Sequence, residues 1–140
     1  MVRSAVLAIG ILVASLACAD NSDSVFEEAL HAARNDDWNG LAQAQKRLSD
    51  DHPLQAYLEF HRLRAALPDL SPQRVVEYGE RYPDSPLPDD IRQHALVAYA
   101  KDSRWRDVLK VYDRAPRGTE LRCYYLRAQW ENGDKGVLPQ

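Results

Sequence analysis

The chain has few of the residue types from which small binding and catalytic sites are built. Two of its 140 residues are cysteines, too few for a disulfide scaffold or a four-ligand zinc site. The six glycines are isolated, which excludes a phosphate-binding loop. The formal charge of −3 gives no excess of basic residues, and this argues against a nucleic-acid partner because phosphates attract basic surfaces.

One apolar run is present, and it lies at the amino terminus. Arg3 precedes residues 5–17, which are almost wholly apolar but fewer than the ~20 residues of a bilayer-spanning helix. Ala17 and Ala19 then form the small-residue pattern that a signal peptidase accepts, and the composition turns polar directly afterwards. We expect residues 1–19 to be a secretory signal peptide cleaved after Ala19, so that the protein leaves the cytoplasm.

A second interpretation of this segment makes Cys18 the lipidated residue of a lipoprotein, because residues 16–18 resemble part of a lipobox. Ser15 stands where that motif favours a larger apolar side chain, so we favour cleavage over lipidation. On either interpretation residues 20–140 form the mature chain, and we expect no transmembrane anchor in it.

Helical patterns joined by proline-containing turns fill the mature chain. A capping box of Ser24 and Glu27 starts the first helix, and Ser71 followed by Pro72 starts another. No segment alternates apolar and polar residues for long enough to be a strand, so the expected fold class is all-α. The predicted helices run from Ser24 to Asn35, from Trp38 onward, from Pro53 to Leu67, from Pro72 to Tyr82, from Asp89 to Lys101, from Trp105 to Pro116 and from Thr119 to Gly133.

Apolar residues at helical spacing indicate which face of each helix is buried. In the third helix this face is predicted to hold Leu54, Tyr57, Leu58, His61 and Ala65. In the later helices the predicted inward residues are Val75, Val76, Tyr78, Ile91, Ala95, Ala98, Tyr99, Val108, Leu109, Tyr112, Leu121, Tyr124, Tyr125 and Ala128.

The predicted helices repeat along the chain. An offset of 67 residues places Trp38 on Trp105. The same offset places Leu41 on Val108, and a middle copy brings Val75 onto Leu41 at an offset of 34. This spacing predicts an α-solenoid of antiparallel helix hairpins, similar to tetratricopeptide repeats, because one hairpin cannot bury its apolar face alone. The alternative is a chance alignment of helices of similar length.

None of the acidic or nucleophilic residues forms a catalytic pattern. Glu59 stands among apolar neighbours, the best place for a raised carboxyl pKa, but we favour a position on the polar face of its helix. Three acid pairs stand at predicted helix N-termini, where the helix dipole favours negative charge: Glu27-Glu28, Asp36-Asp37 and Asp89-Asp90. The histidines lack the spacing of metal ligands, so we expect neither a metal nor a cofactor: His31, His52, His61 and His94.

Positive charge gathers at the carboxyl end of the chain. Residues 20–100 hold 8 basic and 15 acidic side chains, a balance of −7, whereas residues 101–140 hold 9 and 6, a balance of +3. The functional interpretation is a surface for an anionic polymer or an acidic partner, and the simpler one is a set of solvated helix faces. The dominant basic residues are Arg104, Arg106, Lys110, Arg114, Arg117, Arg122 and Arg127.

Three segments of the chain resemble a known family. They are residues 52–60, residues 102–109 around Trp105, and residues 123–130, which contain a C-x-Y-x-x-A-x-W pattern. In order and spacing they are similar to the early part of the long N-terminal superhelix of the soluble lytic murein transglycosylases. The resemblance covers residues 24–134.

The resemblance implies a periplasmic protein of peptidoglycan metabolism whose partners are glycan strands. The family cleaves the β-1,4 bond between N-acetylmuramic acid and N-acetylglucosamine without adding water, through the glutamate of a Glu-Ser motif in a C-terminal catalytic domain. This chain contains no Glu-Ser dipeptide and stops at Gln140, so no catalytic residue is carried over. We expect a truncated or frameshifted product that is inactive alone.

Cys123 would be the one cysteine left after cleavage. The sequence allows either a buried, inert thiol or one that lacks its disulfide partner. The resemblance implies the second, because the family's cysteine at the Cys123 position pairs with one further along, beyond Gln140.

The expected function is that of a non-catalytic superhelical segment, which builds part of a ring that guides glycan strands. The alternative is a small periplasmic helical-repeat adaptor that binds a protein or peptide partner in its groove. A third interpretation is a nonfunctional remnant that is unstable without the helices that would follow.

Overall fold

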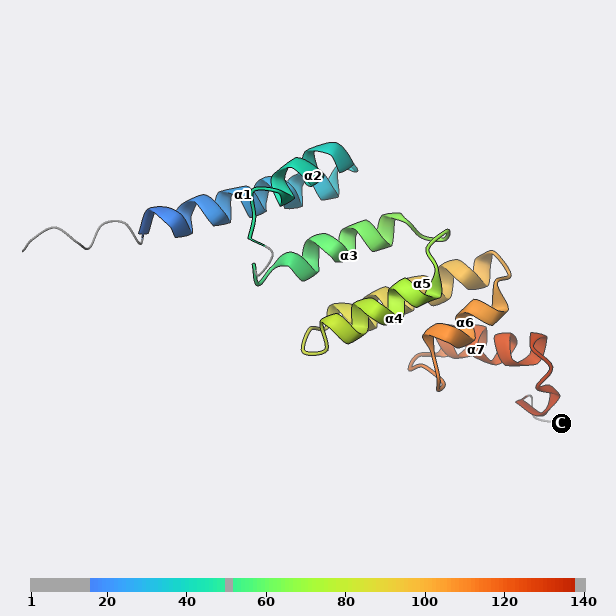
Figure 1. The fold of residues 1–140 in the computed structure, drawn as a ribbon. Coiled ribbons are helices and arrows are strands. Elements are labelled where there is room, and N and C mark those ends of the chain that lie inside the picture. Colours follow the sequence, from blue (N-terminus) through green and yellow to red (C-terminus); the bar gives the residue numbers. More distant parts are fainter. Residues whose placement is uncertain (1–15, 50–51, 138–140) are drawn as a thin grey trace, which may run out of the picture. The chain divides into compact units, whose positions relative to one another are not determined.

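A computed structural model describes residues 16–49 and 52–137 of the chain (Figure 1). Within these residues the backbone forms α-helices, one short 3-10 helix and no β-strand, so the expected all-α fold class is confirmed. The elements are α1 (Leu16–Arg34), α2 (Trp38–Gln45), α3 (Gln55–Ala65), α4 (Pro72–Arg81), α5 (Leu87–Lys101), α6 (Trp105–Val111), α7 (Thr119–Glu131) and η1 (Lys135–Val137).

Local sequence signals explain several helix starts. Asp37 caps α2, where its carboxylate accepts a hydrogen bond of 2.9 Å from the backbone N–H of Gly40. Pro72 is the first residue of α4, as its fixed φ and missing N–H favour. Gly118 precedes α7 with a φ of 91°, a conformation that favours glycine, so that Thr119 begins the helix.

Two predicted helix boundaries are wrong. α1 begins well before Ser24, because residues 16–23 contain neither proline nor glycine and nothing local interrupts the helix. α6 ends at Val111 instead of continuing to Pro116, because Tyr112 adopts extended backbone angles, with φ −130° and ψ 117°. The early end of α6 leaves a longer connection to α7 than the sequence predicts.

The chain divides into two compact units, and each is described by itself. In the first, Met1–His52, α1 and α2 pack against each other. An ion pair of 2.9 Å joins Arg47, shortly after α2, to Glu28 of α1. The buried apolar residues of this unit are Val25, Ala29, Ala32, Ala33, Leu41, Ala44 and Leu48.

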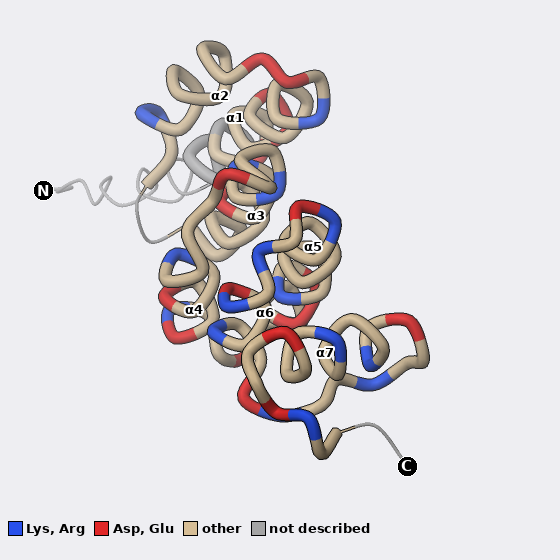
Figure 2. The backbone as a smooth tube through the Cα atoms, turned by 90° about the vertical axis from the view of Figure 1, so that its right-hand side faces the viewer, with Lys and Arg blue, Asp and Glu red and all other residues tan. Residues whose placement is uncertain are grey.

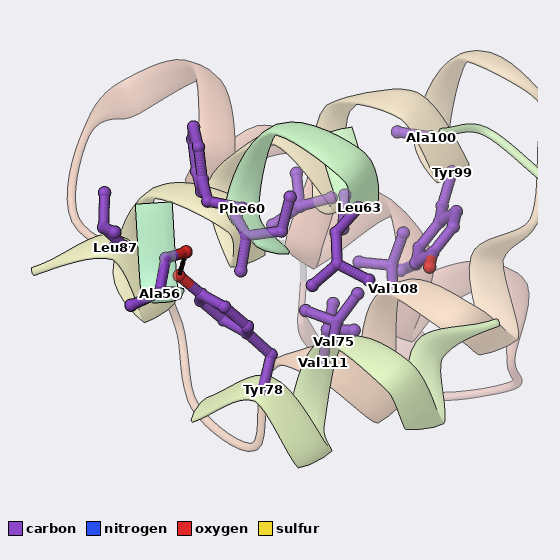
Figure 3. Packing of buried hydrophobic residues seen from close by; sticks show 14 residues of the cluster. Ala56, Phe60, Leu63, Val75, Tyr78, Leu87, Tyr99, Ala100, Val108 and Val111 are labelled. Carbon is purple, nitrogen blue, oxygen red and sulfur yellow. Dashed lines mark hydrogen bonds between the residues drawn. The ribbon is translucent and has the colours of Figure 1, made fainter. Parts of the chain in front are cut away.

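In the second unit, Pro53–Gln140, α5 is the central helix. It packs against α3, α4, α6 and α7, and α4 also packs against α6. The hydroxyl of Tyr78 donates a hydrogen bond of 2.8 Å to the carbonyl of Ala56 inside the core (Figure 3). The buried core cluster consists of Ala56, Phe60, Leu63, Val75, Tyr78, Leu87, Ile91, Ala95, Leu96, Tyr99, Ala100, Val108, Val111 and Ala128.

The packing of this unit agrees with the predicted array of helix hairpins. Moving 33 residues along the chain carries Val75 to Val108, and both side chains are fully buried. The same step carries Ala95 to Ala128, and both are again fully buried. Helices α4 and α6 therefore hold equivalent places, as do α5 and α7, and the contacts α4–α6 and α5–α7 are those of successive repeats.

The predicted inward face of α3 is wrong in part. Tyr57 is 42% exposed, and Ala65 is exposed as well. The α3 residues in the core cluster are Ala56, Phe60 and Leu63, which follow the i, i+4, i+7 spacing of a different stripe. Because α3 carries apolar residues on more than one side, periodicity alone did not identify the stripe that packs on α5.

Candidate functional site

The second unit contains a cleft of about 850 Å³ beside the connection from α6 to α7. Val76 of α4 and the first turns of α5 contribute one part of its lining. Residues 110–117 and Leu121 of α7 contribute the other. The cleft exists because α6 ends early, at Val111, and its volume lies within the range of small-ligand sites.

Charged side chains of both signs line the cleft. The cations are Arg92, Lys110, Arg114 and Arg117, and the anions are Asp89 and Asp113. Arg92 is paired with Asp89 at 3.3 Å. Among the residues that the structure describes, Arg114 and Arg117 have no hydrogen bond or ion pair, and both are exposed.

Gly79 of α4 makes room for the Arg92 guanidinium. A Cβ atom at position 79 would lie 2.5 Å from Nη2 of Arg92 and 3.3 Å from its Cζ. The guanidinium therefore lies against the backbone of α4 while it pairs with Asp89. Arg92 is thus held in place, unlike the two arginines of the α6–α7 connection.

The cleft also has an apolar part, formed by Val76, Val111 and Leu121. Tyr112 is half-buried beside them, and burial raises the pKa of its phenol. The charge of Asp89 raises this pKa further, and Arg92 offsets part of the effect. The Tyr112 hydroxyl therefore stays protonated at neutral pH and remains a hydrogen-bond donor.

Asp107 holds two of the basic residues that the sequence singled out. Its carboxylate pairs with Arg104 at 2.8 Å and with Lys110 at 2.9 Å. Burial opposes ionisation of Asp107, but hydrogen bonds from these two cations outweigh it and lower the pKa of the carboxyl. Arg104 also lies 4.4 Å from the ring centroid of Tyr99 and donates to the carbonyl of Pro68.

The basic carboxyl end therefore contains engaged and unengaged cations. Arg127 is ion-paired at 2.5 Å. Arg106 and Arg122 have no partner in the described part of the chain, but they do not line the cleft. Basic and acidic residues alternate along α6 and α7, so the excess charge forms no continuous basic stretch along the backbone (Figure 2). Arg114 and Arg117 are both unpaired and placed in a cleft.

Glu59 joins two helices of the second unit. Its carboxylate accepts hydrogen bonds of 2.7 Å from Arg81 of α4 and 3.0 Å from the hydroxyl of Tyr82. The side chain is 20% exposed. This engagement explains an acidic residue among apolar neighbours by interhelix pairing instead of by a solvated polar face.

The other acidic candidates and the histidines form no common site. Glu27 and Glu28 lie inside α1, because that helix begins earlier than predicted. Asp89 and Asp90 lie in the first turn of α5, as predicted. Over residues 16–49 and 52–137, no three His, Cys, Asp or Glu side chains are grouped so that they could hold a metal ion.

Three of the predicted processing residues cannot be placed in full. Ala17, Cys18 and Ala19 fall on the first turns of α1, but their side chains lie outside the described residues, so cleavage and lipidation stay predictions. Cys123 is an exposed free thiol on α7, so the interpretation as a buried, inert thiol is wrong. None of the helices among the described residues has the length and apolar character needed to cross a membrane.

Sequence reasoning missed the cleft because its residues come from four helices. Arg92 lies in the acidic part of the sequence, and Val76 is 41 residues from Arg117. The excess of basic residues after position 100 did indicate Lys110, Arg114 and Arg117. Nothing in the spacing separated these from the basic residues that are ion-paired elsewhere.

Comparison with known proteins confirms a distant, partial resemblance to soluble lytic murein transglycosylases. The chain is 27% identical over 124 residues to the soluble lytic murein transglycosylase of Escherichia coli strain K12, and equally to that of Escherichia coli O157:H7. The matched region is 86% of this chain but 19% of each relative, so the chain spans about a fifth of their length. No protein-family model matches the chain, and no solved structure matches it.

Proposed function

We propose that residues 20–140 form a non-catalytic helical scaffold of peptidoglycan metabolism in the periplasm. The observation that carries this proposal is the similarity to soluble lytic murein transglycosylases over 86% of the chain. The stacked hairpins of the second unit support it, because an array of this kind presents extended surfaces to a long partner. The proposed partners are the glycan strands of the cell wall.

The engagement of the acidic residues supports a role without catalysis. Glu59 is tied to Arg81 and Tyr82 by hydrogen bonds of 2.7 and 3.0 Å. Asp107 is held by two cations that keep it ionised, whereas a general acid needs a raised pKa. These contacts leave both carboxylates serving the packing of helices.

Export is part of the same proposal. The proposed signal peptide is residues 1–19, and the mature chain then begins at Asp20. Lipidation of Cys18 is the alternative, which would leave an acylated amino terminus. The intact mass of the protein purified from the producing cells distinguishes the two.

We also propose that Cys123 forms a disulfide with a cysteine outside this sequence. Its exposure on α7 supports this, because an accessible thiol can reach a partner without any change in the core. Thiol labelling of the protein recovered from the periplasm tests it. A fully labelled Cys123 without prior reduction contradicts the disulfide.

The scaffold is tested on isolated sacculi. We expect the purified protein to co-sediment with sacculi and to release no 1,6-anhydromuropeptides, while an active full-length transglycosylase in the same assay releases them. Release that disappears in a Glu59→Gln variant would refute the non-catalytic role. Absence of co-sedimentation, together with one stoichiometric protein partner in a pull-down, would instead support a helical-repeat adaptor.

A further inference from the structure

We propose that the cleft beside the α6–α7 connection binds a short peptide through its carboxylate groups, with Arg114 and Arg117 as the carboxylate-binding residues. The proposal rests on the cleft itself, of about 850 Å³, and on the residues that line it. Under the proposed function, on which this choice of ligand rests, the peptide is the stem peptide attached to the glycan strands.

Two guanidinium groups are available for this role. Arg114 and Arg117 flank Ala115 and Pro116 in the same connection, and both line the cleft. Neither is ion-paired within the described part of the chain, whereas Arg92 and Lys110 already hold carboxylates at 3.3 and 2.9 Å. A free guanidinium offers a fork of N–H donors that matches the two oxygens of a carboxylate.

The acidic residues of the cleft favour a peptide over a densely charged polyanion. Asp113 lies next to Arg114 in the lining and has no hydrogen bond or ion pair among the residues described. Its charge, together with that of Asp89, repels a polyphosphate or a nucleic acid. A stem peptide carries carboxylates, N–H donors and an ammonium group, so it complements a cleft of mixed sign.

The apolar part of the cleft suits the side chains of such a peptide. Val76, Val111 and Leu121 come from three different helices and line the same space. The protonated hydroxyl of Tyr112 adds a hydrogen-bond donor beside them. The cleft thus combines an apolar surface, a neutral donor and two free cations, as sites for small polar ligands commonly do.

The test is titration calorimetry of the purified protein with the acetylated tetrapeptide Ac-L-Ala-γ-D-Glu-L-Lys-D-Ala. We expect binding that weakens at least about tenfold when both peptide carboxylates are amidated, because each charge-assisted bidentate contact is lost. The double variant R114Q/R117Q should weaken binding to a similar extent. Equal affinity for the acid and amidated peptides would overturn the proposal without any variant.

The matched control is the double variant R106Q/R122Q. It removes two exposed cations from the same end of the chain, but neither lines the cleft. We expect it to bind the peptide as the unaltered protein does. Equal losses in the two double variants would show that overall charge acts instead of the cleft, and would also overturn the proposal.

Sacculi separate this inference from the proposed function. Binding to sacculi by both the unaltered protein and R114Q/R117Q, with no affinity for the tetrapeptide, would refute the cleft and leave the scaffold standing. Peptide binding that depends on Arg114 and Arg117, without any binding to sacculi, would support the cleft and refute the scaffold. Thermal unfolding of each variant checks that the helices remain folded.

Discussion

The hydroxyl of Tyr78 shows how single polar atoms are accommodated in the packing of the second unit. Tyr78 is 1% exposed, and its hydroxyl donates to the carbonyl of Ala56 at 2.8 Å, so α4 is tied to α3 at that point. Tyr99 does the same from α5, where its hydroxyl donates to the carbonyl of Leu70 at 2.8 Å. A buried hydroxyl that lacked such a partner would cost free energy on folding.

At this scale we predict that Tyr78→Phe lowers the free energy of unfolding by about 1 kcal/mol, since it removes one buried hydrogen bond and keeps the ring. Tyr57→Phe is the matched control, because Tyr57 is 42% exposed and should change stability by less than about 0.5 kcal/mol. Urea unfolding followed by circular dichroism measures both. Equal effects of the two substitutions would contradict the role of the hydrogen bond.

At the scale of helices, the sequence predicted existence and starts better than faces and ends. Asp37 and Pro72 are local signals, and the helices that they start were expected where the structure has them. The inward face of α3 depends on which stripe meets α5, and Tyr57 and Phe60 are both aromatic, so the choice is decided by tertiary packing. The cleft lies further beyond reach, since it requires four helices to be placed before its residues meet.

The central place of α5 leads to a prediction for Ile91. Its side chain is fully buried on the helix that packs against four others, so Ile91→Ala leaves a cavity and should lower the free energy of unfolding by roughly 2–5 kcal/mol. Val97→Ala is the control on the same helix. Val97 is half-buried, and its truncation should cost about 1 kcal/mol or less. Thermal unfolding would contradict the arrangement if Val97→Ala were the more damaging change.

At the scale of the whole molecule, the buried tyrosines set an upper limit on the pH at which the fold is stable. Burial raises the pKa of Tyr99 to about 12, an effect that Arg104 partly offsets and Asp107 adds to. Burial is also the main cause of the raised pKa of Tyr78, of Tyr82 and of Tyr112. All four belong to the second unit, so their titration acts on one core.

The sign of the pH dependence follows from proton binding. Above pH 10 a tyrosine of the unfolded chain loses its proton, while buried Tyr99 keeps its own up to about pH 12. The folded state then binds more protons than the unfolded state, so the free energy of unfolding falls as the pH rises. We predict stability that is unaffected by these phenols below pH 9 and declines steeply between pH 10 and pH 12. Urea unfolding at a series of pH values measures this, and Tyr99→Phe should flatten the decline, because its ring has no proton to lose.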